Sequence, residues 1–188
     1  GEWMPSVAAN ELHVQGRWSK DETVNRGHFI KTYVHTRYPV FTLNLAGSVP
    51  GIRPDDFGYF RPEFSIDWKF RIPPAGMSKI HFNCGTIVGR VPYPFLHLHE
   101  GNVTNLLSKS SFSCMDYLEF VSDTWATLFW YHNFNGYFFG KVPWLKKLNW
   151  REEFTFKMAY GYLSDRNRQA VIQFAPGMKT MDKWPYME

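Results

Sequence analysis

One segment, residues 60–71, constrains the fold more than any other part of the sequence. Every even position from 60 to 70 is apolar, and every odd position from 61 to 71 is polar or charged. Because a β-strand places successive side chains on opposite faces, the segment predicts a long strand with one aromatic and one charged face. Pro62 cannot donate a ladder hydrogen bond, which is typical of the start or edge of a strand.

The same alternation returns at residues 150–162, where Glu152 alone interrupts the apolar face. Weaker alternation predicts further strands at residues 12–18, 29–35, 40–49, 77–88, 124–134 and 169–174, with 115–121 as another strand or a bridge. Turn residues such as Pro, Gly, Asn and Asp separate these segments. We therefore expect an all-β fold, an antiparallel meander of eight or nine strands joined by hairpins, in one domain over residues 1–188.

Strand length favours a transmembrane β-barrel, or most of one, over a soluble fold. Soluble strands average about 5–6 residues, whereas strands that cross a bilayer need about 9–11. The two best segments here run to 12 and 13 residues, and aromatic residues make up 19% of the chain. Lipid accepts large rings without the shape matching that a protein core demands.

In such a barrel the two faces of each strand meet different surroundings. The apolar face is predicted to contact lipid, at Phe60, Phe64, Ile66, Trp68, Phe70, Trp150, Phe154, Phe156, Tyr160 and Tyr162. The charged face is predicted to line the lumen, at Arg61, Glu63, Asp67, Lys69, Arg151, Glu153 and Lys157. These charges would either tune a hydrated passage or fill the lumen with a static network of ion pairs.

Composition excludes several other classes of protein. The net charge of +4 is too small to indicate a nucleic-acid partner. The uncharged run at 124–140 contains His132 and Asn133, so it does not predict a membrane-spanning helix. No basic region leads into an apolar one at the N-terminus. Cys84 and Cys114 lack metal-site spacing, and two free thiols are favoured over one disulfide.

Catalytic and metal-binding patterns are weak. His97 and His99 would share a face of a strand and could reach one cation, but the spacing places no third ligand. A polar loop is the favoured interpretation. The carboxylate pairs Asp55–Asp56 and Glu152–Glu153 lie in a turn and across a strand. We therefore expect no enzyme activity, no metal and no cofactor.

A basic group surrounds Pro143, formed by Lys141, Lys146, Lys147 and Arg151. It has two interpretations, contact with lipid headgroup phosphates at a membrane rim or a solvated turn.

Four segments carry a resemblance to a known family. They are GRVPYPFL with HEGN at residues 89–102, EFVSDTWA at 119–126, HNFNGYFF at 132–139 and KVPWLKKLNWRE at 141–152. They resemble the C-terminal barrel of a Bacteroidetes outer-membrane family of unknown function. The motif residues are His132, Phe134, Asn135, Gly136 and Pro143. The resemblance covers residues 38–188, is specific in 89–165 and is weak before Tyr38.

The resemblance implies a larger protein with an N-terminal carboxypeptidase-regulatory-like domain and a barrel distantly similar to surface-antigen assembly barrels. We expect this chain to lack the N-terminal periplasmic region and the final strands. The implied role is envelope biogenesis, protein translocation or transport, with outer-membrane lipid and other envelope proteins as partners. The competing prediction is a soluble β-sandwich or lipocalin-like barrel that binds an apolar or glycan ligand on its aromatic face.

Overall fold

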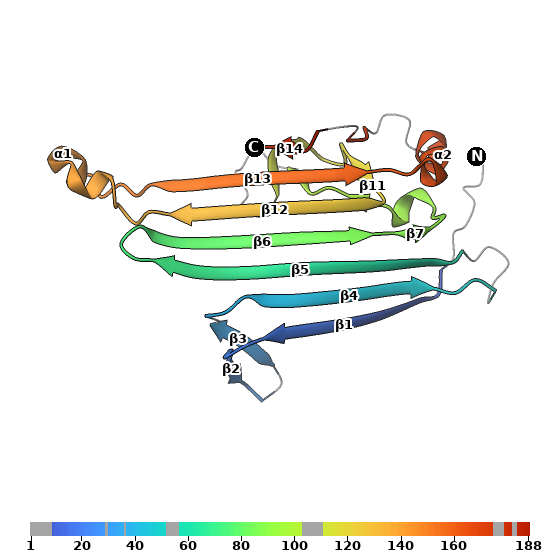
Figure 1. Cartoon of the computed structure of the whole chain (residues 1–188), viewed down its shortest axis with the longest axis horizontal. Helices are drawn as coiled ribbons and strands as arrows, with labels where there is room; N and C mark the ends of the chain where they lie inside the picture. The colour runs from blue at the N-terminus through green and yellow to red at the C-terminus, as the bar shows by residue number, and fades with distance from the viewer. Residues whose placement is uncertain are drawn as a thin grey trace.

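The computed structural model describes residues 9–28, 30–35, 37–51, 57–102, 111–174, 179–181 and 184–188. Within them the chain is all-β, with one large antiparallel sheet and a few short helices (Figure 1). The prediction of an all-β fold with long antiparallel strands is confirmed. No helix in the described ranges is long and apolar enough to cross a membrane.

The large sheet has eight strands in the order β1-β4-β5-β6-β12-β13-β14, with β7 paired to the start of β5. Their bounds are β1 (Glu11–Ser19), β4 (Val40–Ser48), β5 (Tyr59–Ile72), β6 (Gly76–Thr86), β7 (Val88–Gly89), β12 (Thr124–Asn133), β13 (Glu153–Tyr162) and β14 (Tyr186–Met187). Six of them, β1, β4, β5, β6, β12 and β13, lie side by side and have 9 to 14 residues each (Figure 1). They therefore exceed the usual length of soluble strands.

The expectation of a meander joined throughout by hairpins is wrong between β6 and β12. These strands are neighbours in the sheet, paired from Thr124–Thr86 to Asn133–Met77. The chain between them forms separate elements, η1 (Tyr93–Phe95), β8 (His97–Leu98), β9 (Gly101–Asn102), β10 (Phe112–Asp116) and β11 (Val121–Ser122). We call residues 90–102 and 111–123 the insert. In it β8 pairs antiparallel with β11, and β9 pairs parallel with β10.

Two other connections leave the large sheet at one end. Between β1 and β4, the strands β2 (Thr23–Arg26) and β3 (Lys31–His35) form a hairpin. The predicted strand at 29–35 thus begins at Lys31, and Phe29 lies outside the described residues. Between β12 and β13 come η2 (Phe139–Lys141) and α1 (Pro143–Lys146), which project beyond the end of the strands (Figure 1).

The predicted strand at residues 150–162 is three residues too long, because β13 begins at Glu153. Asn149 has a positive φ of 52° and turns the chain. Glu152 then uses its side chain to accept a hydrogen bond from the backbone N–H of Phe139. The backbone carbonyl of Glu152 also accepts one from Phe134. Trp150 and Arg151 consequently belong to the loop.

The strand predicted at residues 169–174 is also wrong, since these residues lie in the helix α2 (Asp165–Phe174). The carbonyl of Ser164 accepts hydrogen bonds from the N–H groups of Asn167 and Arg168 and starts the first turn. The buried side chain of Asp123 in turn accepts from the backbone N–H of Ser164 at 3.0 Å. A tertiary contact with the insert thus fixes the chain at this point, which local alternation could not predict.

Candidate functional site

The register of the large sheet gives it two faces of opposite character. Directly paired residues of an antiparallel ladder share a face, so the pairings assign every side chain. One face carries no Asp, Glu, Lys or Arg on any of the six long strands, all of which the structure describes. We call it the apolar face: Leu12, Val14, Gly16, Trp18, Phe41, Leu43, Leu45, Gly47, Phe60, Pro62, Phe64, Ile66, Trp68, Phe70, Ile72, Ser78, Ile80, Phe82, Cys84, Thr86, Thr124, Ala126, Leu128, Trp130, His132, Phe154, Phe156, Met158, Tyr160 and Tyr162.

The opposite face, which we call the polar face, carries all the charged side chains of these strands. They are Glu11, Arg17, Arg61, Glu63, Asp67, Lys69, Arg71, Lys79, Glu153 and Lys157. His13, Gln15, Asn44, His81 and Asn83 lie among them.

Almost all of the residues predicted to face lipid lie on the apolar face. Trp150 is the exception, because it lies in the loop before β13 and is 58% exposed. The residues predicted to line the lumen lie on the polar face, again with one exception, Arg151, which precedes the strand. Alternation within each strand thus identified two continuous surfaces, although the pairing between strands was unknown from sequence.

The apolar face is left uncovered by the described residues. Leu12, Trp18 and Tyr162 are 73%, 64% and 50% exposed. Neither of the two buried core clusters contains a residue of this face. A contiguous apolar surface of this extent is rare on a soluble monomer, where such patches usually mark contact with a partner or a membrane.

The insert packs instead on the polar face, near the end where β5 begins. A first cluster joins Tyr59 and Trp125 of the sheet to Val91, Leu96 and Val121 of the insert. Trp125 is 1% exposed and Val121 is fully buried. The folded core of this chain therefore lies between the insert and the charged side of the sheet.

A second cluster lies further along β13. Phe112 and Met115 of β10 pack against Ala159, with Phe129 and Tyr186 at the margin. The ring of Phe112 lies 5.0 Å from that of Phe129 and 5.6 Å from that of Tyr186. Phe112 is completely buried although its strand has only five residues. The insert is thus anchored at two points on one face.

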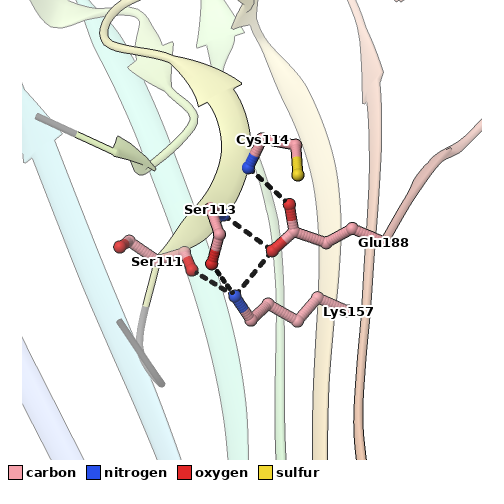
Figure 2. Close-up of polar contacts among 5 residues, drawn as sticks. All are labelled: Ser111, Ser113, Cys114, Lys157 and Glu188. Atoms are coloured by element: carbon pink, nitrogen blue, oxygen red, sulfur yellow. Dashed lines mark hydrogen bonds and ion pairs between the residues drawn. The ribbon is translucent and has the colours of Figure 1, made fainter. Parts of the chain in front are cut away.

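A buried lysine fastens the insert and β14 to the sheet (Figure 2). The Nζ of Lys157 donates to a carboxylate oxygen of Glu188 at 2.6 Å, to Ser113 Oγ at 2.8 Å and to the carbonyl of Ser111 at 2.8 Å. The same carboxylate accepts the backbone N–H groups of Ser113 and Cys114. The charge of Lys157, whose side chain is 5% exposed, is thereby fully hydrogen-bonded.

Two glycines make room for aromatic and polar groups on the polar face. Gly85 and Gly161 are the partners of Trp125 on either side in the sheet. A Cβ at Gly85 would lie 2.4 Å from the indole of Trp125. One at Gly161 would lie 2.1 Å from Ser122 Oγ and 2.7 Å from His99 Nε2. Glycine at position 85 therefore leaves room for the indole of Trp125, and glycine at position 161 allows the close approach of the insert.

His97 and His99 form part of this packed region and not a polar loop. The ring of His97 stacks on Trp125 at 4.1 Å, with 8° between the planes. His99 Nε2 lies 2.9 Å from Ser122 Oγ, and the residue is 2% exposed. Within the described ranges, no three His, Cys, Asp or Glu side chains are placed to hold a metal ion.

Burial also changes the acid–base behaviour of these two rings. It lowers the pKa of His97 to about 3, with the charges of His99 and Arg61 acting in the same direction. Burial lowers the pKa of His99 to about 4. The desolvated imidazolium is disfavoured, so both rings are neutral at pH 7.

A second polar centre joins the end of the insert to α2. Asn167, 1% exposed, donates to Asp123 at 3.0 Å and to the carbonyl of Gly89 at 3.3 Å, and accepts the N–H of Val91 at 3.1 Å. Ser164 Oγ also donates to Asp123. Sequence analysis missed this centre, because its members are far apart in the chain. Asp123 lies within the EFVSD motif, but the motif alone gave it no role.

Other polar side chains of this face bind one another across the sheet. Asn83 donates to Glu63 at 2.7 Å and accepts the indole N–H of Trp125 at 2.7 Å. Asp67 lies 2.8 Å from His81 Nδ1. The two carboxylates, Glu63 and Asp67 of β5, are thus each held by a side chain of β6. Both interpretations of the charged face stay predictions.

The motif residues at 132–143 shape one end of the sheet. His132 Nε2 lies 2.9 Å from the carbonyl of Ala75, and Nδ1 lies 2.6 Å from Ser78 Oγ, so both nitrogens of this imidazole have partners within the chain. Phe134 packs on His132 with ring centres 4.3 Å apart. Asn135 and Gly136 take positive φ values of 59° and 79° in the turn. Pro143 occupies the first turn of α1, where its missing N–H costs nothing.

Both cysteines are free thiols. Cys84 lies on the apolar face of β6, and Cys114 lies in β10 of the insert on the other side of the sheet. The carboxylate pair Asp55–Asp56 lies outside the described residues. In the other pair, Glu152 lies in the loop and Glu153 begins β13.

These features define an all-β protein whose long antiparallel strands form a sheet with one uncovered apolar face and one polar face that holds a packed insert. Residues 4–167 match the C-terminal domain of a family of unknown function (DUF5686). The chain belongs to this family. The match starts well before Tyr38, where the motifs had suggested only weak resemblance. No curated protein and no solved structure matches the chain.

Proposed function

We propose that the chain is a non-catalytic membrane-spanning β-barrel domain, or most of one, of a bacterial outer membrane. The observation that carries the proposal is the position of the insert. In a soluble antiparallel sheet the apolar face packs on the core and the polar face meets water. Here the core clusters lie on the charged face, while Leu12, Trp18 and Tyr162 on the aromatic face are open.

Strand length supports the same function. A strand tilted across a bilayer needs about 9–11 residues. The shortest of the six long strands, β1 and β4, have 9 residues, and β5 has 14. Trp68 and Trp130 lie in one row of the apolar face near the end that carries α1, with Ile80 between them. Aromatic residues at such a level are typical of the membrane interface.

Under this proposal the polar face lines a lumen, and the insert occupies it. Lys157 and Trp125 of the sheet contact the insert and hold it in place. Glu63 and Asp67 are hydrogen-bonded to side chains of β6. Backbone groups cannot remain unpaired in hydrocarbon. A membrane-spanning barrel therefore requires further strand pairing at the outer edges of β1 and β13. Within the described residues, β13 pairs with β14 at Met158 and Ala159, and Lys157 exchanges backbone hydrogen bonds with Glu188.

The biological role that we propose rests on the family resemblance alone. It is envelope biogenesis, protein translocation or transport in a Bacteroidetes outer membrane, alongside a carboxypeptidase-regulatory-like domain and other envelope proteins. In this role the chain supplies a scaffold and a passage, and it performs no chemistry of its own.

The test is the behaviour of the purified chain with and without detergent. We expect it to partition into detergent or liposomes and to show a compact form that migrates differently on a gel before and after heating. A monomer that stays soluble without detergent would contradict the proposal. The aromatic face would then be a ligand surface of a lipocalin-like barrel or sandwich.

A further inference from the structure

A notch opens beside β5 at the end of the sheet that carries α1. The first residue of β4, Val40, pairs with Asp67, so residues 68–72 of β5 pair with β6 alone. Within the described residues, this part of β5 has no strand partner on the side that β4 occupies further along. A cavity of about 910 Å³ occupies this place, between the last residues of β5 and the chain that enters β4.

Three cations line the notch, Arg37, Lys69 and Arg71. Among the described residues none of them forms an ion pair or a hydrogen bond through its side chain. The nearest carboxylate along β5, Asp67, is held by His81 at 2.8 Å. No Asp or Glu belongs to the described lining. The notch therefore presents uncompensated positive charge.

Aromatic side chains form the rest of the lining. The rings of Trp68 and Phe70 lie 4.2 Å apart, and Tyr38, in the chain that enters β4, also lines the cavity. Trp68 and Phe70 belong to the apolar face, whereas Lys69 and Arg71 belong to the polar face. A ligand in the notch would thus meet cations and apolar rings together, so it would carry both an anion and an apolar portion.

We propose that this notch binds the phosphate of an anionic lipid headgroup, with the apolar part of the lipid lying along Trp68 and Phe70. This inference rests on the proposed function, because the notch lies where the apolar face would meet the membrane interface. Arginine guanidinium groups bind phosphate through paired hydrogen bonds, and lysine adds a point charge. Tryptophan is enriched at the same level of the membrane.

The experiment measures lipid binding by native mass spectrometry of the chain in detergent micelles. The probes are phosphatidic acid, phosphatidylcholine and inorganic phosphate. We expect phosphatidic acid to bind about a hundredfold more tightly than phosphatidylcholine, since each of the three basic groups contributes a preference of about fivefold for an anionic lipid. The triple variant R37Q/K69Q/R71Q should lose this preference, and K69Q/R71Q should lose most of it.

The matched control is R90Q/R166Q/R168Q, which removes the same charge at the opposite end of the sheet, beside β7 and α2 (Figure 1). It should bind phosphatidic acid as the wild-type chain does. If both triple variants bound phosphatidic acid equally weakly, the proposal would be overturned, because net charge alone would then explain binding. Displacement of the lipid by equimolar inorganic phosphate would also overturn it, in favour of a soluble phosphate ligand.

Heat-modifiable migration of each variant separates this inference from the proposed function. A wild-type chain without a heat-modifiable form contradicts the proposed function. A wild-type chain that has this form but binds both lipids equally contradicts only the assignment of the notch.

Discussion

Lys157 on β13 donates a hydrogen bond of 2.6 Å to Glu188, and this pair is the centre from which the insert is held against the polar face (Figure 2). The lysine comes from the middle of a long strand, and its carboxylate partner reaches two backbone N–H groups of β10. Burial of the Lys157 charge without a partner would cost free energy. Paired with Glu188, this charge instead connects β13 to β10, which is distant in the chain.

Replacement of Lys157 by Met should destabilise the folded chain strongly. The variant leaves the carboxylate of Glu188 without its cation, and removal of one partner of a buried pair costs about 3–5 kcal/mol. The measurement is the free energy of unfolding in urea, in the presence of lipid vesicles. The double variant K157M/E188Q should recover part of the loss. If both variants unfold as the wild-type chain does, the pair does not hold the insert.

Substitution of Gly161 by Ala should loosen the insert, because the new Cβ would lie 2.1 Å from Ser122 Oγ. Overpacking of this kind costs about 1–3 kcal/mol. Gly16→Ala is the matched control, since a Cβ there meets only the carbonyl of Leu43 at 4.0 Å on the apolar face. Hydrogen exchange of the insert amides distinguishes the two, and equal exchange in both variants would argue against a close contact at Gly161.

Acidification should weaken the packing of the insert before it affects most carboxylates. Burial holds the pKa of His99 at about 4, below the usual value of 6.5, so the unfolded state binds more protons below pH 6.5. The contribution of His99 to the free energy of unfolding is therefore fully present above pH 6.5 and is lost as the pH decreases towards 4. At pH 5 the loss from this ring alone is about 2 kcal/mol.

Unfolding free energies at pH 7, 6 and 5 test this linkage. The variant H97Q/H99Q should show a smaller slope between pH 6.5 and 5 than the wild-type chain. An unchanged slope would show that other groups control the acid sensitivity.

The two free thiols report on the two sides of the sheet. In liposomes, a membrane-impermeant maleimide should modify Cys114, which is exposed on the insert. It should leave Cys84 unmodified, because lipid would cover the apolar face. The single-cysteine variants C84S and C114S separate the two signals by mass. Rapid modification of Cys84 in liposomes would contradict the assignment of this face to lipid.

Local alternation was enough to predict the faces of individual strands. At residues 60–71 each side chain is placed by the pleat of its own strand, so no knowledge of neighbours is needed. The pairing of β6 with β12 was not predictable in this way, because it depends on an intervening insert whose own contacts are long-range. Its strands are short, as β8 and β11 have two residues each and show no periodicity.

The errors at the ends of elements have a similar cause. Trp150 continues the apolar alternation of β13, but Glu152 turns its side chain to the N–H of Phe139 and ends the strand pairing. The helix α2 depends on the contact of Ser164 with Asp123, 41 residues earlier in the chain. Tertiary hydrogen bonds override the local pattern at both places.

The most direct test of the central claim compares arginine at two adjacent positions of β4. Leu43 lies on the apolar face and is 45% exposed, whereas Asn44 lies on the polar face next to Glu63. Arginine on the lipid side of a barrel costs about 2–4 kcal/mol near the bilayer midplane, and the lumen side tolerates it. We therefore expect Leu43→Arg to reduce insertion into liposomes and folding stability there, while Asn44→Arg inserts as the wild-type chain does. Equal insertion of the two variants, or a greater loss for Asn44→Arg, would contradict the assignment of the apolar face to lipid.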